Sequence, residues 1–176
     1  MKATVFFSIF ICQFFVLSLH AQNAVDKSTR VAIGQQVPAF EFVSGDGEKA
    51  SIADYHGKLI LINFFATWCG PCMKELPHLE NEIYNKYKDN PDFVLLVVGR
   101  EHSREEMKAF RTKKQFSFDL IADPQRTIYS KFAKEYIPRN FLIDRDGTIL
   151  YSSIGFNDAE FANLKELIAQ KLDSIK

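Results

Sequence analysis

The stretch Phe65-Ala-Thr-Trp-Cys-Gly-Pro-Cys72 decides the expected fold, because it places two cysteines at the junction of a strand and a helix. Before it, residues 59–65 read Leu-Ile-Leu-Ile-Asn-Phe-Phe, a nearly continuous apolar run of strand length. Such runs are typical of a central strand buried on both faces. After it, residues 73–88 have the apolar spacing of a helix. The cysteine pair is therefore expected where a buried strand ends and a helix begins.

This position favours thiol chemistry, since the first turn of a helix presents unpaired amides and a partial positive charge. Both stabilise a thiolate, the form that attacks disulfides. Cys69 is expected at the exposed first-turn position as the nucleophile, with Cys72 one turn later beneath it as the resolving thiol. Pro71 suits a helix start because its missing amide costs nothing there.

Two alternatives to redox chemistry are a structural staple and a metal site. Cysteines three residues apart close almost no loop, so a disulfide between them hardly constrains the unfolded chain. A closed zinc site usually needs four ligands, and His56, His78 and His102 form no ligand-spaced pair. A reduced pair of cysteines without a chemical role is a third alternative. Export of the protein would disfavour it, because compartments outside the cytoplasm are oxidising. We expect no metal and no cofactor other than the Cys69–Cys72 disulfide itself.

The N-terminus has the pattern of a secretory signal. Met1-Lys2 is charged, residues 3–19 are uncharged and mostly apolar, and Ala21 precedes polar Gln22-Asn23. We expect residues 1–21 to be a signal peptide, residues 22–34 a flexible lead-in and residues 35–176 one domain. The apolar run is close to the length that spans a bilayer, so an uncleaved membrane anchor is the alternative. Either outcome predicts an exported, periplasmic protein.

The charge balance excludes some partners. The chain has 22 basic and 22 acidic residues, and only Lys2 lies in the expected signal, which leaves 21 against 22. A balanced surface gives no reason to propose nucleic acid or an anionic membrane surface as partner.

The rest of the chain alternates short strands and helices and predicts one α/β domain with a mixed sheet and helices on both faces. Ser103 with Glu106 forms a capping box for one helix, and Asp158 is expected to cap the last. Pro77 should kink the helix after the cysteines. The remaining expected elements are a hairpin at 38–43 and 49–52, strands at 93–98, 141–143 and 149–151, a helix at 103–113, an edge element at 118–122 and a short helix at 127–134.

The cysteine motif resembles the active-site motif of thioredoxins. With the hairpin, Gly57-Lys58 and the phrase Ile137-Pro138…Phe141-Leu-Ile-Asp-Arg-Asp-Gly147, residues 35–175 look most like the exported branch, the TlpA/ResA-like thiol–disulfide oxidoreductases. The resemblance implies a thioredoxin-like fold, with a central mixed sheet flanked by helices and an N-terminal β-hairpin extension.

The resemblance also implies site roles. Trp68 would shield the thiolate and contact partners, and Gly70 and Pro71 would lie on the same substrate side. Pro138 would be cis and would expose the backbone of Ile137 for pairing with a substrate strand. The alternative for Pro138 is an ordinary trans loop proline.

Two positions depart from the cytoplasmic thioredoxin pattern. Asn63 stands where those proteins carry a buried Asp, and Glu75 stands where the exported branch carries a Glu three residues after the second cysteine. Glu75 shares a helix face with Cys72, so its carboxyl could assist proton transfer there. The alternative is an ordinary surface glutamate.

Arg139-Asn140 follows the expected cis proline, at positions where the family more commonly has small or hydroxyl residues. Arg139 is expected either on the rim of a substrate groove, where it would favour acidic partners, or as a solvated loop residue.

The expected function is an extracytoplasmic thiol–disulfide oxidoreductase. The Gly-Pro dipeptide resembles reducing members, so we expect it to reduce disulfides of partner proteins and to be re-reduced by a membrane thiol-transfer protein. Cytochrome c maturation and disulfide repair are the roles that the family implies. A peroxiredoxin-type peroxidase and a non-catalytic metal- or protein-binding module are the alternatives, although Thr67-Trp68-Cys69 has the wrong spacing for the first.

Overall fold

The computed structural model describes residues 27–45 and 47–174. The expected signal peptide or anchor at residues 1–21 lies outside them. Within the described part of the chain, no helix combines the length and apolar character needed to cross a bilayer. Residues 28–34 belong to the expected flexible lead-in, yet Arg30 and Gly34 donate backbone hydrogen bonds to Phe132 and Ile149, both of 2.8 Å. These two hydrogen bonds attach part of the expected lead-in to the domain.

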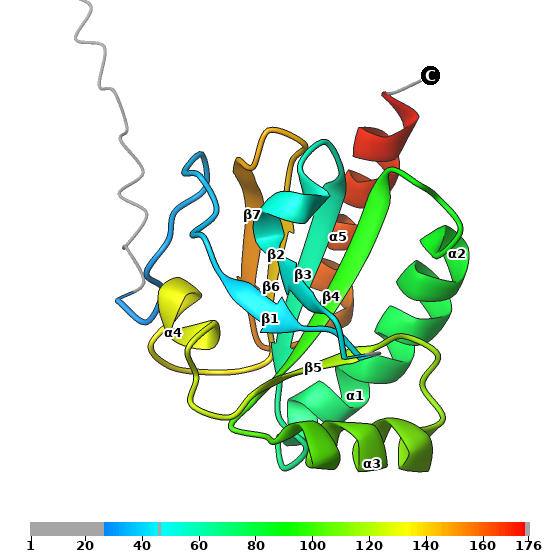
Figure 1. Ribbon diagram of the computed structural model, residues 1–176. Helices are drawn as coiled ribbons and strands as arrows, with labels where there is room; N and C mark the ends of the chain where they lie inside the picture. Colours follow the sequence, from blue (N-terminus) through cyan, green and yellow to red (C-terminus); the bar gives the residue numbers. More distant parts are fainter. Residues whose placement is uncertain (1–26, 46, 175–176) are drawn as a thin grey trace, which may run out of the picture.

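A five-stranded mixed sheet forms the centre of the domain, in the order β5-β4-β3-β6-β7 (Figure 1). β3 pairs in parallel with β4, and β4 with β5, whereas β6 is antiparallel to both β3 and β7. This is the mixed α/β sheet that the sequence predicts. Its strands are β3 (Leu59–Phe65), β4 (Phe93–Arg100), β5 (Leu120–Asp123), β6 (Arg139–Ile143) and β7 (Ile149–Ile154).

The central strand β3 is buried along its whole length, as its apolar sequence predicts. Alternate side chains point to opposite faces of a strand. Leu61 and Phe65 join one hydrophobic cluster, and Ile62 and Phe64 join the cluster on the other face. Asn63 therefore points to the same face as Leu61 and Phe65.

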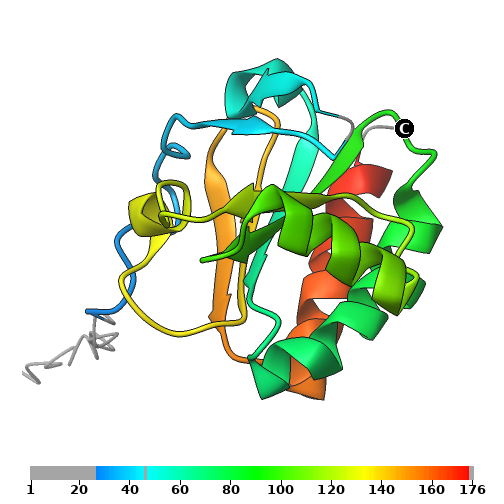
Figure 2. The same ribbon diagram turned by 60° about the horizontal axis from the view of Figure 1, so that its bottom comes forward.

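Helices cover the two faces unequally (Figure 2). The Asn63 face packs against α1 (Gly70–His78), α3 (Arg104–Lys114) and α5 (Asp158–Asp173), which contribute Leu76, Met107 and Leu164 to its cluster. The opposite face carries the short helix α4 (Tyr129–Phe132), the 3₁₀ turn η1 (Ile52–Tyr55) and the N-terminal hairpin.

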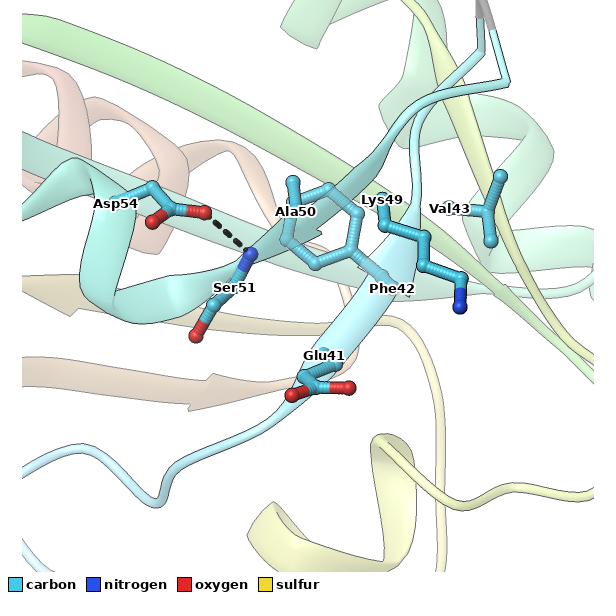
Figure 3. Close-up of a pocket in the computed structure, with 7 residues that line it drawn as sticks. All are labelled: Glu41, Phe42, Val43, Lys49, Ala50, Ser51 and Asp54. Carbon is cyan, nitrogen blue, oxygen red and sulfur yellow. Dashed lines mark hydrogen bonds between the residues drawn. The ribbon is translucent and has the colours of Figure 1, made fainter.

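The N-terminal hairpin is a separate two-stranded antiparallel sheet of β1 (Glu41–Val43) and β2 (Lys49–Ser51). A hollow of about 370 Å³ lies along it (Figure 3). Beside the hollow, the carboxylate of Asp54 accepts a 2.7 Å hydrogen bond from the amide of Ser51. None of the residues that line the hollow belongs to the cysteine motif.

The helix after the cysteines becomes π-helical just after Pro77, where the sequence predicts a kink. α1 ends at His78, the π-helical segment η2 (Leu79–Tyr84) follows, and the short helix α2 (Asn85–Tyr87) comes directly after it. Pro77 has no amide to bond to the turn behind it, and the amide of Leu79 reaches back to the carbonyls of both Glu75 and Leu76. A proline followed by π-helical geometry is a recognised cause of helix bending.

Helix caps confirm one prediction and correct another. Ser103 and Glu106 form the expected reciprocal capping box at α3. At α5, however, the cap is Asn157, whose side-chain oxygen accepts a 2.9 Å hydrogen bond from the amide of Glu160. Asp158 is instead the first helical residue, so the predicted cap was wrong by one position.

Candidate active site

Cys69 and Cys72 form a disulfide at the N-terminus of α1, with their Cα atoms 5.3 Å apart. Cys69 is the N-cap of the helix, and the amide of Cys72 donates to its Sγ at 3.2 Å. β3 ends four residues earlier, so the strand-to-helix junction predicted from the sequence is present. An amide directed at Sγ stabilises negative charge on that sulfur when the disulfide is reduced.

The two sulfurs differ less in burial than expected. Cys72 is fully buried, and Cys69 is only 6% exposed. The expectation of an exposed, first-turn Cys69 is therefore wrong, because the residue caps the helix and packs into the cluster on the α1 face. Cys69 is still the more accessible of the pair, and Gly70 and Pro71 beside it are exposed.

A cis peptide bond joins Ile137 and Pro138 next to the disulfide. The carbonyl oxygen of Ile137 lies 3.6 Å from Sγ of Cys69. The trans loop alternative for Pro138 is thus excluded, and the backbone before it faces the attacking sulfur as the resemblance implies.

Exposed aromatic side chains flank the disulfide. Trp68 precedes Cys69 and is 62% exposed, and Tyr136 precedes Ile137 and is 59% exposed. The guanidinium of Arg100, at the end of β4, lies 5.5 Å from the Trp68 ring centre. Sequence reasoning missed Arg100 and Tyr136. Arg100 could have been predicted near the cysteines, because β3 and β4 are parallel neighbours and their carboxyl ends meet at one edge of the sheet.

His102 supports the loop before Cys69, a role that sequence reasoning missed. The amide of Thr67 donates to Nε2 of His102 at 3.0 Å, and the imidazole is buried. Nε2 must therefore be unprotonated, which leaves the proton on Nδ1, 3.7 Å from a carboxylate oxygen of Glu106. Nothing in the local sequence distinguishes this histidine from the other two weighed as metal ligands.

Glu75 is buried beneath the cysteine pair, 1% exposed, so the surface-glutamate alternative is wrong. Its Oε2 accepts a 2.9 Å hydrogen bond from Nδ2 of Asn63, and its Oε1 accepts one of 2.6 Å from Nδ2 of Asn140. Nδ2 of Asn63 also donates to Oδ1 of Asn140 at 2.9 Å. The two asparagines are register partners on β3 and β6, which explains why both reach one carboxyl group.

Burial raises the pKa of Glu75 from 4.5 to about 7, although hydrogen bonds from Asn140 and Asn63 and the nearby His78 oppose the change. A carboxyl group with a pKa near neutrality can both accept and release a proton at physiological pH. Cys72 lies one turn before Glu75 on the buried side of α1. Oδ1 of Asn63 is also buried and has no hydrogen-bond partner among the described residues, so it can accept one further hydrogen bond.

Arg139 lies far from either expected location. It is fully buried at the start of β6, and its guanidinium donates to the carbonyl of Glu135 at 3.0 Å, to Oγ1 of Thr29 at 2.7 Å and to Oγ of Ser28. Both the groove-rim and the solvated-loop interpretations are therefore wrong. β6 begins two residues earlier than expected, and strand alternation turns Arg139 to the α4 face, opposite to Asn140.

Comparison with known proteins gives a consistent match over the hairpin, the sheet and the cysteine pair. The Redoxin family model matches residues 32–168. The thiol-disulfide oxidoreductase ResA of Geobacillus thermodenitrificans is 30% identical over 154 residues, which are 88% of this chain and 84% of that protein. The thioredoxin-like protein YneN of Bacillus subtilis is 30% identical over 153 residues, 86% of this chain and 85% of that protein.

Among solved structures, a solution structure from Bacteroides thetaiotaomicron, described as a protein disulfide isomerase, superimposes with a TM-score of 0.80. It is 36% identical in sequence, and the match covers 83% of this chain and 93% of that one. StoA from Bacillus subtilis matches with a TM-score of 0.61 and 26% identity, over 74% of this chain and 96% of that one.

Proposed function

The chain belongs to the Redoxin family and is a TlpA/ResA-like thiol–disulfide oxidoreductase of the thioredoxin superfamily, and from this premise we propose that it reduces disulfides of partner proteins outside the cytoplasm. The observation that carries the proposal is the Cys69–Cys72 disulfide at a helix N-terminus, with the Ile137 carbonyl 3.6 Å from the outer sulfur. Glu75, with a pKa near 7, lies one turn below.

In the proposed cycle the reduced protein donates two electrons. The Cys69 thiolate attacks one sulfur of the partner disulfide, which forms a mixed disulfide and releases the other partner sulfur as a thiolate. Glu75 then accepts the proton of Cys72, and the Cys72 thiolate attacks Sγ of Cys69. The Cys69–Cys72 disulfide closes, and the second partner thiolate leaves. The 3.2 Å contact from the Cys72 amide supports Cys69 as the first nucleophile.

Substrate binding is assigned to Trp68, Gly70, Pro71, Ile137 and Pro138. Trp68 offers an exposed aromatic surface, and beyond its chain neighbours and its own helix backbone a Cβ placed on Gly70 would meet no atom of the described residues within 4 Å, so this approach to the sulfur is open. The backbone of Ile137 can pair with an extended segment of the partner. Such pairing gives affinity with little dependence on side chains, which suits an enzyme that acts on several proteins.

The cellular setting of the proposal rests on sequence features. Residues 1–21 have the pattern of an export signal or an N-terminal anchor, and an exported reductase needs a source of electrons in an oxidising compartment. We assign that supply to a membrane thiol-transfer protein. Cytochrome c maturation and repair of wrong disulfides are the two roles that would use such a reductase.

Reduction of insulin with dithiothreitol as electron donor tests the activity. The wild-type protein should accelerate insulin reduction, and Cys69→Ser should lose this acceleration. Undiminished turnover in Cys69→Ser would overturn the assignment. Consumption of hydrogen peroxide in place of insulin would instead support a peroxidase.

The role of Glu75 has its own test. The Cys72 thiol should titrate differently in Glu75→Gln than in the wild-type protein, because a neighbouring carboxylate and a neutral amide affect a thiol differently. Identical Cys72 titrations in the two proteins would remove Glu75 from the mechanism without affecting Cys69.

A further inference from the structure

A row of polar side chains crosses the sheet below Glu75. Asn63 on β3, Asn140 on β6 and Ser153 on β7 are register neighbours, so they lie side by side. All three are buried, and Nδ2 of Asn140 lies 3.4 Å from Oγ of Ser153. The row leads from Glu75 toward the edge strand β7, away from the cysteines.

A small cavity continues this row toward the surface. Its volume is about 10 Å³, near the minimum that holds one water molecule. It is lined by Glu75 of α1, by Asn140, Tyr151 and Ser153 of the sheet, and by the start of α5. The hydroxyl group of Tyr151 lies 3.4 Å from the carbonyl oxygen of exposed Glu160. The cavity therefore connects a buried carboxyl group with the protein surface.

The proposed reaction cycle can use such a connection. Glu75 accepts a proton in each cycle and must lose it before the next, either to Cys72 when the pair is re-reduced or to solvent. On the cysteine side the way to solvent is closed, because Cys72 is fully buried, Cys69 is 6% exposed and a bound partner would cover it. A proton that Glu75 does not return to Cys72 therefore needs a second way out.

We propose that Glu75 exchanges its proton with solvent through this cavity, by way of one water molecule bound between its carboxyl group and the hydroxyls of Ser153 and Tyr151. The proposal rests on the proposed function, in which Cys72 gives its proton to Glu75. The proton then passes from the Glu75 carboxyl to the water, the water passes a proton to the Tyr151 hydroxyl, and that hydroxyl releases its own proton to solvent at the start of α5. The carboxylate is regenerated, and no electrons move in this step.

The charged and titratable groups around Glu75 are compatible with this route. His78 and Cys72 share its helix, and Glu160 approaches from α5 beyond Tyr151. Burial raises the pKa of Tyr151 above its usual value of 10, and the Glu160 and Glu75 carboxylates add to this. Tyr151 therefore stays protonated at neutral pH and serves as a hydrogen-bonding hydroxyl, not as a base.

Two variants and a matched control test the route. Ser153→Val replaces the hydroxyl with a methyl group and adds a second methyl group that fills the cavity, whereas Tyr151→Phe removes a single oxygen atom. Ser152→Val makes the same change at the adjacent position, which does not line the cavity. If Ser153→Val fails to fold, Tyr151→Phe still tests the proposal.

The first measurement is a carboxyl ¹³C NMR titration of Glu75 in the oxidised proteins. Loss of the bound water removes a hydrogen bond to the carboxylate, so the pKa of Glu75 should rise by about one unit in both cavity variants and stay unchanged in the control. Its ionised fraction at pH 7 would then fall from about one half to about one tenth, so closure of the mixed disulfide by Cys72 should slow up to about fivefold. The first attack by Cys69 should keep its rate.

A high-resolution crystal structure gives the direct test, with a water expected within hydrogen-bond distance of Glu75 and of Ser153 or Tyr151. A cavity without that water, or cavity variants that titrate and react like the control, would overturn the route. Glu75→Gln distinguishes failure of the proton route from failure of the proposed role of Glu75. If it slows closure by Cys72 but the cavity variants do not, only the proton route fails; if it has no effect, the role of Glu75 itself fails.

Discussion

The buried Glu75 should make the stability of the oxidised protein fall as the pH rises, and Glu75→Gln should remove that dependence. In the unfolded chain the carboxyl group releases its proton near its ordinary pKa of 4.5, whereas in the folded protein it does so at about 7. Between these values the folded state binds more protons than the unfolded state. The free energy of unfolding therefore decreases across this interval.

The size of the effect follows from the change in pKa. At about 1.36 kcal/mol per unit, the rise from 4.5 to about 7 corresponds to roughly 3 kcal/mol. Because Glu75 is 1% exposed, solvent screening reduces this value little. The full contribution is present below about pH 4.5, where both states are protonated, and is lost above about pH 7.

Glutamine at this position is neutral at every pH. Its amide group would face Asn63 or Asn140, which both donate to Glu75, so the variant should lose a hydrogen bond worth about 1 kcal/mol at all pH values. This constant cost leaves the shape of the profile unaffected. The pH dependence of the difference between the two proteins is therefore the quantity to compare.

The assay is urea unfolding of the oxidised proteins from about pH 4 to about pH 9. From low to high pH, Glu75→Gln should gain roughly 3 kcal/mol relative to the wild-type protein. Glu105→Gln removes the charge of an exposed carboxylate on α3 and serves as the control, with a nearly constant difference. Parallel profiles for the wild-type protein and Glu75→Gln would refute the reasoning.

Three further substitutions test packing and capping. Gly99→Ala would place a Cβ 2.1 Å from Sδ of Met107, and this overpacking should cost about 1–3 kcal/mol and lower the Tm in calorimetry; an unchanged Tm would contradict it. Ser103→Ala removes half of the capping box with Glu106 and should lower the free energy of unfolding, measured in urea, by about 1 kcal/mol. An unchanged free energy of unfolding would mean that the cap does not stabilise the protein. Arg139→Leu removes the buried guanidinium that holds the N-terminal segment and should cost about 3 kcal/mol, with faster amide hydrogen exchange over residues 28–34; protection equal to the wild-type protein would argue against this contact.

Local pattern was sufficient for most of the fold. β3 matches the predicted residues 59–65 because a strand buried on both faces leaves a continuous apolar run. Ser103 identified its helix start because the capping box is a local chemical arrangement. Asn157 and Asp158 are both good N-caps and adjacent, so sequence alone could not decide between them.

The surroundings of the cysteines were harder to predict, because they depend on residues far apart in the chain. The hydrogen bond between Asn63 and Asn140 joins positions 77 residues apart, and only strand register brings both to Glu75. The burial of Arg139 depends in the same way on the N-terminal segment, 110 residues away. Family resemblance indicated Glu75, but its asparagine partners required the structure.

Capture of a mixed disulfide tests the division of roles between Cys69 and Cys72 most directly. Each single Cys→Ser variant is reduced and mixed with an excess of a disulfide-bonded peptide, and the adducts are measured by mass spectrometry. Cys72→Ser should accumulate a stable adduct through Cys69, because the resolving thiol is missing. Cys69→Ser should form far less adduct, since Cys72 is fully buried. Equal adduct formation in the two variants, or a dominant adduct on Cys72, would contradict the proposed exchange mechanism.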